Sequence, residues 1–167
     1  MNKKNNFIIL SLVILALIFR MLLEQFHLDW VLTGAYLSLL TIISTYYGVY
    51  SQRHNSDEEF DLMMDFKGGA QGGASFAFGA GFVTYIFYKF IQPHYLDIFI
   101  DGRRQLILDR PTENAAIALD NFNEFASMIF VPFNWSVLTI ASLTFLSIFY
   151  AIVFAIITKF FPKFVNK

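Results

Sequence analysis

The sequence predicts an all-α fold, a bundle of four transmembrane helices with two amphipathic helices in one connection. Only 15% of the 167 residues are charged, whereas about 25% are charged in an ordinary soluble domain. Four segments are long and apolar enough to cross about 30 Å of hydrocarbon, which takes roughly 20 residues of helix. We therefore expect a single integral membrane domain over residues 1–167.

The predicted spans are separated by short polar connections, except for one long loop between the third and the fourth. The second and third spans contain no formal charge, whereas Arg20 lies near the end of the first. The four spans are Phe7–Leu23, Trp30–Tyr50, Gly68–Tyr88 and about Trp135–Thr158, and the long loop is Lys89–Asn134.

The first span has an alternative interpretation as a signal peptide, because Lys3 and Lys4 precede the apolar run Phe7–Phe19. A cleavage site needs small residues after such a run. Arg20 and Glu24 stand there instead, so we expect an uncleaved span.

Arg20 and Glu24 are also four residues apart, and they can pair on one helix face. One interpretation is a buried ion pair at a polar site in the membrane. The other is that both charges reach the headgroups from the end of the span.

Lys and Arg residues indicate the orientation. If both termini are cytoplasmic, seven of them lie inside and five outside, and three of those five, Arg103, Arg104 and Arg110, lie well inside the long loop. Long loops translocate largely regardless of charge, so these three count little. Trp30 and Trp135 then fall at the outer interface, where tryptophan anchors helices. We expect both termini to be cytoplasmic.

The connection after the second span carries five acidic residues against Arg53. Ser56 and Glu59 have capping-box spacing, which predicts that a helix begins near Asp57 and runs into the third span. We expect the acidic residues, Asp57–Asp65, to form a solvated face. Binding of a cation or a basic partner is the alternative.

The long outer loop has the pattern of two amphipathic helices. The first follows Pro93, and the second ends before Pro132. About 45 residues bury too little surface for an independent core, so their apolar faces must rest on lipid, on the spans or on a partner. In the second helix, apolar residues recur with helical period at Ala115, Leu119, Phe122, Ala126 and Ile129.

Three arginines of the outer loop are candidate contacts for an anionic lipid headgroup, because guanidinium forks fit phosphate and carboxylate groups. Ordinary interfacial charge with local pairing is the alternative. The three are Arg103, Arg104 and Arg110.

The stretch "FKGGAQGGASFAFGAGF", Phe66–Phe82, holds six of the nine glycines. It lacks the Gly-Lys-Ser/Thr ending of a P-loop, and Thr84 stands where a dinucleotide fingerprint has its third glycine. Its small residues recur every four positions, which lets another helix approach closely. The packing partner is a span of this chain, a second copy or another protein. The candidate helix-packing residues are Gly68, Gly69, Gly72, Gly73, Ser75, Gly79 and Gly81.

Groups suited to catalysis are scarce. The chain has no cysteine, and its three histidines, His27, His54 and His94, fall in three different connections. We therefore expect no catalytic residue, no cofactor and no metal site. The net charge of −1 gives no support to nucleic-acid binding.

The run "MDFKGGAQGGASFAFGAGFVTYIFYKFIQPHYLDIF" resembles an uncharacterised bacterial family of small four-helix inner-membrane proteins, a domain of unknown function. A Phe-Lys entry, a Gly-rich third span and the corner Ile91-Gln92-Pro93 carry the resemblance. It implies the bacterial inner membrane and supplies no catalytic residues. Members are often encoded near polyprenyl-phosphate glycosyltransferases, which implies such an enzyme as a candidate partner.

These observations favour a non-enzymatic inner-membrane subunit or accessory protein of a larger cell-envelope complex. Its partners would be the lipid bilayer and other membrane proteins, or a second copy of the chain. Two alternatives stay open: an oligomeric transporter of small lipids or solutes, and a membrane anchor for a polyprenyl-phosphate glycosyltransferase.

Overall fold

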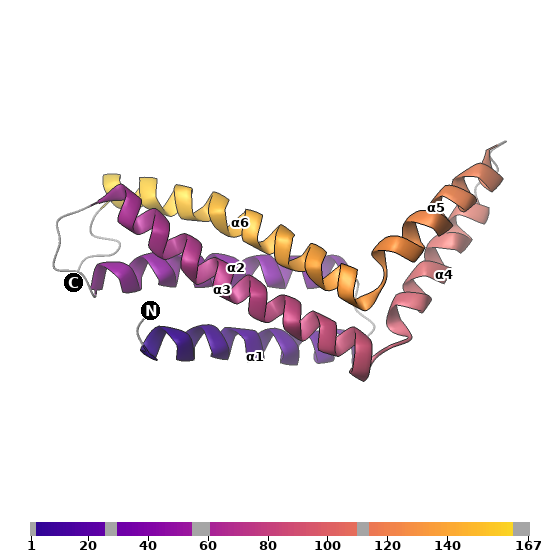
Figure 1. Cartoon of the computed structure of the whole chain (residues 1–167), viewed down its shortest axis with the longest axis horizontal. Coiled ribbons are helices and arrows are strands. Elements are labelled where there is room, and N and C mark those ends of the chain that lie inside the picture. Colours follow the sequence, from indigo (N-terminus) through magenta and orange to yellow (C-terminus); the bar gives the residue numbers. More distant parts are fainter. Residues whose placement is uncertain (1–2, 26–29, 55–60, 110–113, 162–167) are drawn as a thin grey trace. The chain divides into compact units, whose positions relative to one another are not determined.

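The computed structural model describes residues 3–25, 30–54, 61–109 and 114–161, and the side chains of residues 3–5, 24–25 and 30–31 lie outside this description. Within the described ranges every regular element is a helix (Figure 1). The all-α class is thereby confirmed. The elements are α1 (Lys3–Gln25), α2 (Trp30–His54), α3 (Leu62–Ile86), the π-helical turn η1 (Phe87–Ile91), α4 (Tyr95–Leu108), α5 (Ala115–Ile129) and α6 (Pro132–Phe160).

Among the described residues, four helices are long and apolar enough to cross a membrane, so the chain is a membrane protein. The candidate spans reach further than the sequence predicted, because the second continues to His54 and the third begins at Leu62. The added turns carry Arg53 and Asp65, which pair with each other. Pairing makes it less costly to place both charges close to apolar surroundings. The four candidate spans are Asn6–Leu23, Leu32–His54, Leu62–Ile91 and Pro132–Phe160.

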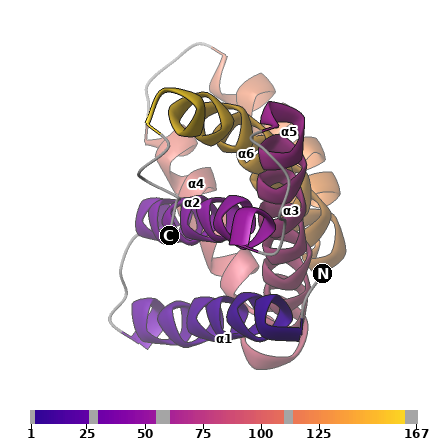
Figure 2. The ribbon, with the colours of Figure 1, turned by 90° about the vertical axis from the view of Figure 1, so that its left-hand side faces the viewer.

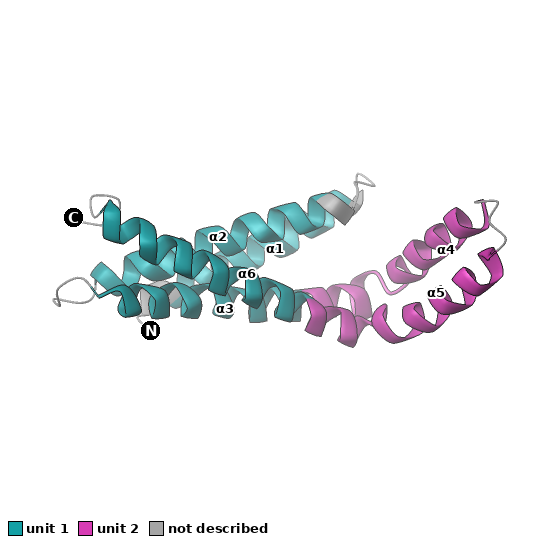
Figure 3. Cartoon of the chain, turned by 90° about the horizontal axis from the view of Figure 1, so that it is seen from above, with its two compact units in different colours: residues 1–83, 139–167 teal, residues 84–138 magenta. Residues whose placement is uncertain are grey.

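The chain divides into two compact units, coloured separately in Figure 3. Unit 1 comprises Met1–Val83 and Thr139–Lys167, and unit 2 comprises Thr84–Leu138. The expectation of one membrane domain over residues 1–167 stays a prediction.

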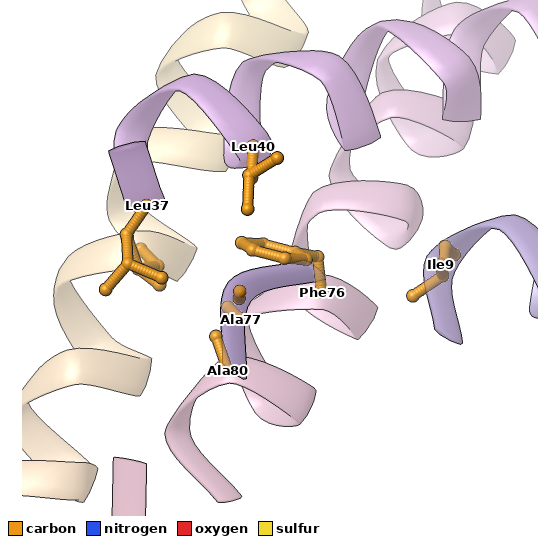
Figure 4. Packing of buried hydrophobic residues seen from close by; sticks show 8 residues of the cluster. Ile9, Leu37, Leu40, Phe76, Ala77 and Ala80 are labelled. Carbon is orange, nitrogen blue, oxygen red and sulfur yellow. The ribbon is translucent and has the colours of Figure 1, made fainter. Parts of the chain in front are cut away.

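In unit 1, α2 lies between α1 and α6, and α3 crosses the other helices diagonally (Figures 1 and 2). The start of α3 packs on α2 and α6, whereas Gly79, further along, meets Val13 of α1. The hydrophobic core gathers around Phe76, which is fully buried between the helices (Figure 4). Its other buried members are Ile9, Ala16, Leu37, Leu40, Ala77, Ala80 and Leu143.

Unit 2 is built on a hairpin of α4 against α5. Leu96 and Ala126 are buried in it. The other four residues of the apolar period predicted for α5 are half-buried, at Ala115, Leu119, Phe122 and Ile129. Pro132 occupies the first position of α6, where the absent N–H of proline costs no helical hydrogen bond.

The described part of α3 begins with a side-chain cap. The Asp61 Oδ1 atom accepts a hydrogen bond from the Met63 backbone N–H at 2.9 Å. This satisfies one of the N–H groups that the first helical turn leaves without an intrahelical partner. The predicted capping box of Ser56 and Glu59, and a start near Asp57, lie outside the described residues.

Candidate functional site

A buried ion pair joins the end of α2 to the beginning of α3. The Arg53 guanidinium donates from Nε to Asp65 Oδ1 at 2.8 Å and from Nη2 to Oδ2. The two side chains are 10% and 0% exposed. Two parallel bonds from one planar fork fix the orientation of the carboxylate as well as its position.

A third helix joins this pair through a hydroxyl group. Thr158 of α6 donates from Oγ1 to Asp65 Oδ2 at 2.7 Å, with the Ala155 carbonyl oxygen at 3.0 Å as the alternative acceptor for the same hydrogen. Thr158 is buried as well. Arg53, Asp65 and Thr158 form what we call the buried polar cluster, and it connects three of the four candidate spans.

The positions of the two charges suit the helices that carry them. Arg53 is in the last turn of α2 and Asp65 is in the first turn of α3. A cation is favoured at a helix C-terminus and an anion at a helix N-terminus, since the peptide dipoles leave partial charges of opposite sign there. Helix geometry and ion pairing therefore favour the same arrangement.

The burial of Asp65 corrects one expectation from the sequence. We expected the acids from Asp57 to Asp65 to form a solvated face, but Asp65 is fully buried. Both of its oxygens accept hydrogen bonds from Arg53, and one also accepts from Thr158. Asp61 is exposed, and residues 57–60 lie outside the described ranges.

The spacing of Asp65 from the glycines was the signal that the sequence reasoning missed. Gly68, Gly69 and Gly72 follow Asp65 at three, four and seven positions, so all four residues lie on one side of the helix. The side of α3 that approaches other helices most closely therefore begins with an acidic residue.

Beyond Asp65, α3 meets its neighbours almost backbone to backbone. A Cβ atom on Gly72 would lie 2.6 Å from the Ser44 carbonyl oxygen of α2, and one on Gly69 would lie 3.1 Å from the Ala151 Cβ atom of α6. Ser44 Oγ also donates to the Gly72 carbonyl oxygen at 2.8 Å. We call Gly68, Gly69, Gly72 and Gly73 the glycine face. The sequence left the packing partner of these glycines open, and the contacts described here are with helices of the same chain.

The remaining candidate packing residues lie further along α3. Gly81 is buried, whereas Ser75 and Gly79 are half-buried. Opposite Gly73 stands Ser147 of α6, whose buried Oγ atom has no hydrogen-bond partner among the described residues. The smallest side chains thus occur where the helices come nearest to one another.

Arg20 is buried on α1 and donates from Nη1 to the Thr33 Oγ1 atom of α2. It therefore links the first two spans. The side chain of Glu24 lies outside the described residues, so the predicted Arg20–Glu24 ion pair stays a prediction.

The arginines of the outer loop lie in unit 2. Arg104 donates to Asn123 Oδ1 at 2.7 Å and to Asp101 Oδ1 at 3.0 Å. The Arg103 guanidinium carbon lies 5.4 Å from the centre of the Phe99 ring. Arg110 is outside the described residues. Contact of these arginines with an anionic headgroup stays a prediction.

Within the described ranges, no three His, Asp or Glu side chains form a group that fits a metal ion. The chemistry that the buried polar cluster offers is that of a structural tie. It supplies charge-assisted hydrogen bonds between three helices, and its carboxylate oxygens are already engaged.

Comparison with protein-family models, with curated proteins and with solved structures finds no match to this chain. The resemblance to a family of small four-helix inner-membrane proteins therefore stays an expectation.

Proposed function

We propose that the chain is a non-enzymatic subunit or accessory protein of a larger membrane complex of the bacterial cell envelope. It would reside in the inner membrane with both termini in the cytoplasm. The observation that carries the proposal is Gln71, an exposed amide side chain on a membrane-spanning helix.

The depth of Gln71 in the membrane decides whether its exposed side chain meets water or hydrocarbon. The candidate span Leu62–Ile91 has 30 residues, so at about 1.5 Å per residue it is about 45 Å long, the thickness of a bilayer with its headgroups. If that span begins at the outer edge of the headgroups, Gln71 lies about 14 Å along it, past a headgroup layer of about 5–8 Å. The amide therefore faces hydrocarbon unless another protein helix covers it.

The chemistry of glutamine identifies what would cover it. An amide has both hydrogen-bond donors and an acceptor, and glutamine joins helices in membranes through such bonds. Ser75 and Phe78 follow on the same side of α3, one and two turns later, and Phe78 is exposed. A helix of a partner protein with a polar group at this depth would hydrogen-bond to Gln71 and cover this side of α3.

The side-chain contacts of the structure favour a subunit or accessory protein over a glycosyltransferase anchor or a transporter. An acidic docking loop for a glycosyltransferase would have to act without Asp65, which is committed to Arg53 and Thr158. A headgroup site for a transporter would have to compete with the partners that Arg104 already has. Both alternatives stay predictions.

The test is purification from native membranes in mild detergent, comparing the wild type with Gln71→Leu. We expect the wild type to elute as a complex and Gln71→Leu to lose most of the associated protein. Phe149→Leu is the matched control, because Phe149 is an exposed apolar residue of α6. A wild-type protein that elutes only as a monomer would overturn the proposal, and a differently tagged second copy distinguishes self-association from a foreign partner.

The proposed orientation has its own test, which uses the absence of cysteine. Asp61→Cys and Asp101→Cys place single thiols in the connections on either side of α3, and both residues are exposed. In intact cells, a membrane-impermeant maleimide should label only the second. If only the thiol at position 61 were labelled, the orientation would be the reverse of the one proposed.

A further inference from the structure

The α4–α5 hairpin has a polar side, which the bond from Arg104 to Asn123 identifies. Asp97 stands seven positions before Arg104, and Asp120 stands three before Asn123, so each lies on the same side of its helix. Both are exposed. Asp101 accepts the second bond from Arg104 at 3.0 Å. This side of the hairpin therefore carries Asp97, Asp101, Arg104 and Asp120.

The opposite side is apolar. Successive residues of an α-helix are about 100° apart, so a residue two positions further on points in nearly the opposite direction. Leu106 follows Arg104 by two positions and Phe125 follows Asn123 by two. Both side chains are 54% exposed. The apolar side of the hairpin thus presents large hydrophobic residues from both of its helices.

This apolar side continues into the beginning of a membrane span. Phe99, seven positions before Leu106, has its ring centre 5.1 Å from that of Phe130. The ring centre of Phe125 lies 6.2 Å from that of Phe130. The Phe130 ring lies 5.1 Å from Trp135, in the first turn of α6. All of these residues belong to unit 2.

The end of α3 and the following turn η1, in the same unit, have the composition of a membrane interface. Lys89 Nζ donates to the Tyr85 hydroxyl oxygen at 2.6 Å, and it lies 5.5 Å from the centre of the exposed Phe90 ring. Tyrosine, tryptophan and lysine gather at this level because they combine an apolar body with a polar tip. Both span ends that carry the hairpin therefore have residues suited to the headgroup region.

We propose that the apolar side of the α4–α5 hairpin binds the lipid bilayer surface, in the leaflet that holds the beginning of α6. The charged side then faces water, where the Arg104–Asp101 pair is solvated. An amphipathic helix in this position inserts its apolar face about 5–10 Å into the boundary of headgroups and acyl chains. Continuity with Trp135 favours lipid as the occupant, because the apolar surface of a span end is already in contact with lipid.

The experiment uses single cysteines in the full chain, reconstituted in nanodiscs of phosphatidylethanolamine and phosphatidylglycerol. Leu106→Cys and Phe125→Cys report on the apolar side, and Asp97→Cys and Asp120→Cys are matched controls on the same two helices. Each thiol receives an environment-sensitive fluorophore. Quenching is measured with iodide in water and with lipids spin-labelled near the headgroup.

We expect the probes at Leu106 and Phe125 to emit at shorter wavelength, to be quenched by the spin-labelled lipid and to be protected from iodide. The probes at Asp97 and Asp120 should respond to iodide alone. Equal iodide quenching on both sides would show that the hairpin stands in water. Protection of Leu106 and Phe125 from both quenchers would show that protein covers them. Either result overturns the proposal.

Discussion

Two arginine–aspartate pairs occupy opposite environments in this molecule. Arg53–Asp65 joins two candidate spans, with side chains 10% and 0% exposed, whereas Arg104–Asp101 lies on the hairpin with side chains 44% and 70% exposed. Both are hydrogen-bonded, but water solvates and screens only the second. Removing one partner of the buried pair leaves the other charge uncompensated in a medium of low dielectric constant. The same two residue types therefore differ greatly in how much the fold depends on them.

Glycines show the same contrast. Gly72 lies where α3 meets the backbone of α2, but nothing lies within 4 Å of a Cβ atom built on Gly34 or Gly102. Close approach makes glycine necessary at the first position. At the other two, its flexible backbone only weakens a helix.

The largest effect should follow removal of the buried carboxylate. Asp65→Ala leaves the Arg53 guanidinium without its partner, and we expect the free energy of unfolding to fall by about 3–5 kcal/mol. The measurement is unfolding by sodium dodecyl sulfate in mixed micelles, followed by far-UV circular dichroism. The double variant Arg53→Met/Asp65→Leu should recover much of the loss, because neither charge is then buried alone. A loss below about 1 kcal/mol, typical of an exposed pair, would remove the distinction between the two environments.

Next come the glycines of the close contact. Gly72→Ala places a methyl group 2.6 Å from the Ser44 carbonyl oxygen, which cannot move without its helix. We expect a loss of about 1–3 kcal/mol in the same unfolding assay, as for overpacked cores.

Gly34→Ala and Gly102→Ala are the controls for this substitution. Alanine favours a helix interior over glycine by about 0.5–1 kcal/mol, so both should leave the protein as stable or slightly more stable. If all three variants behaved alike, the close approach of α2 and α3 would not be what requires glycine.

A smaller effect should follow loss of the third member of the buried polar cluster. Thr158→Val removes the hydroxyl that donates to the Asp65 carboxylate, at an expected loss of about 1.5 kcal/mol. Thr144→Val is the control, because its buried Oγ1 atom has no hydrogen-bond partner among the described residues. Combined with Asp65→Ala, Thr158→Val should cost little more, since the acceptor is already gone. Additive losses would mean that Thr158 stabilises α6 without acting on Asp65.

The smallest effect belongs to the hairpin. Arg104→Gln gives up the exposed pair with Asp101, and we expect a change below about 1 kcal/mol that shrinks further as salt is added. The midpoint of thermal unfolding at two ionic strengths is a sufficient measurement. A loss as large as that of Asp65→Ala, and insensitive to salt, would show that this pair is shielded from water.

Much of the fold follows from local pattern. Runs of apolar residues predicted the four spans, because crossing hydrocarbon requires them whatever the neighbours are. In α5, the helical period predicted an amphipathic helix with Ala126 on its apolar face, and the residues of that period are buried or half-buried. The spacing of the glycines likewise indicated a close helix contact, though it did not identify the helices involved.

The buried polar cluster was not predicted, because Thr158 is 93 residues from Asp65, and Arg53, 12 residues from Asp65, lies on another helix. Arg53 and Thr158 are more than 90 residues apart, yet both reach Asp65. No local pattern connects Arg53 with Thr158, and Asp65 belongs to a run of acidic residues that we expected to be solvated. Similarly, the bond from Arg20 to Thr33 depends on how α1 packs against α2.

The sequence alone determined that this protein is helical and spans a membrane. It also determined which face of the third span has the small side chains, since composition and period act within one helix. Only the tertiary structure decided that the glycine face is covered by α2 and α6, and that Asp65 is buried while Asp101 stays exposed. Burial is a property of what neighbouring helices bring to a residue. Asp65 and Asp101 have the same chemistry. The packing around each decides whether its charge links helices in the interior or faces the solvent.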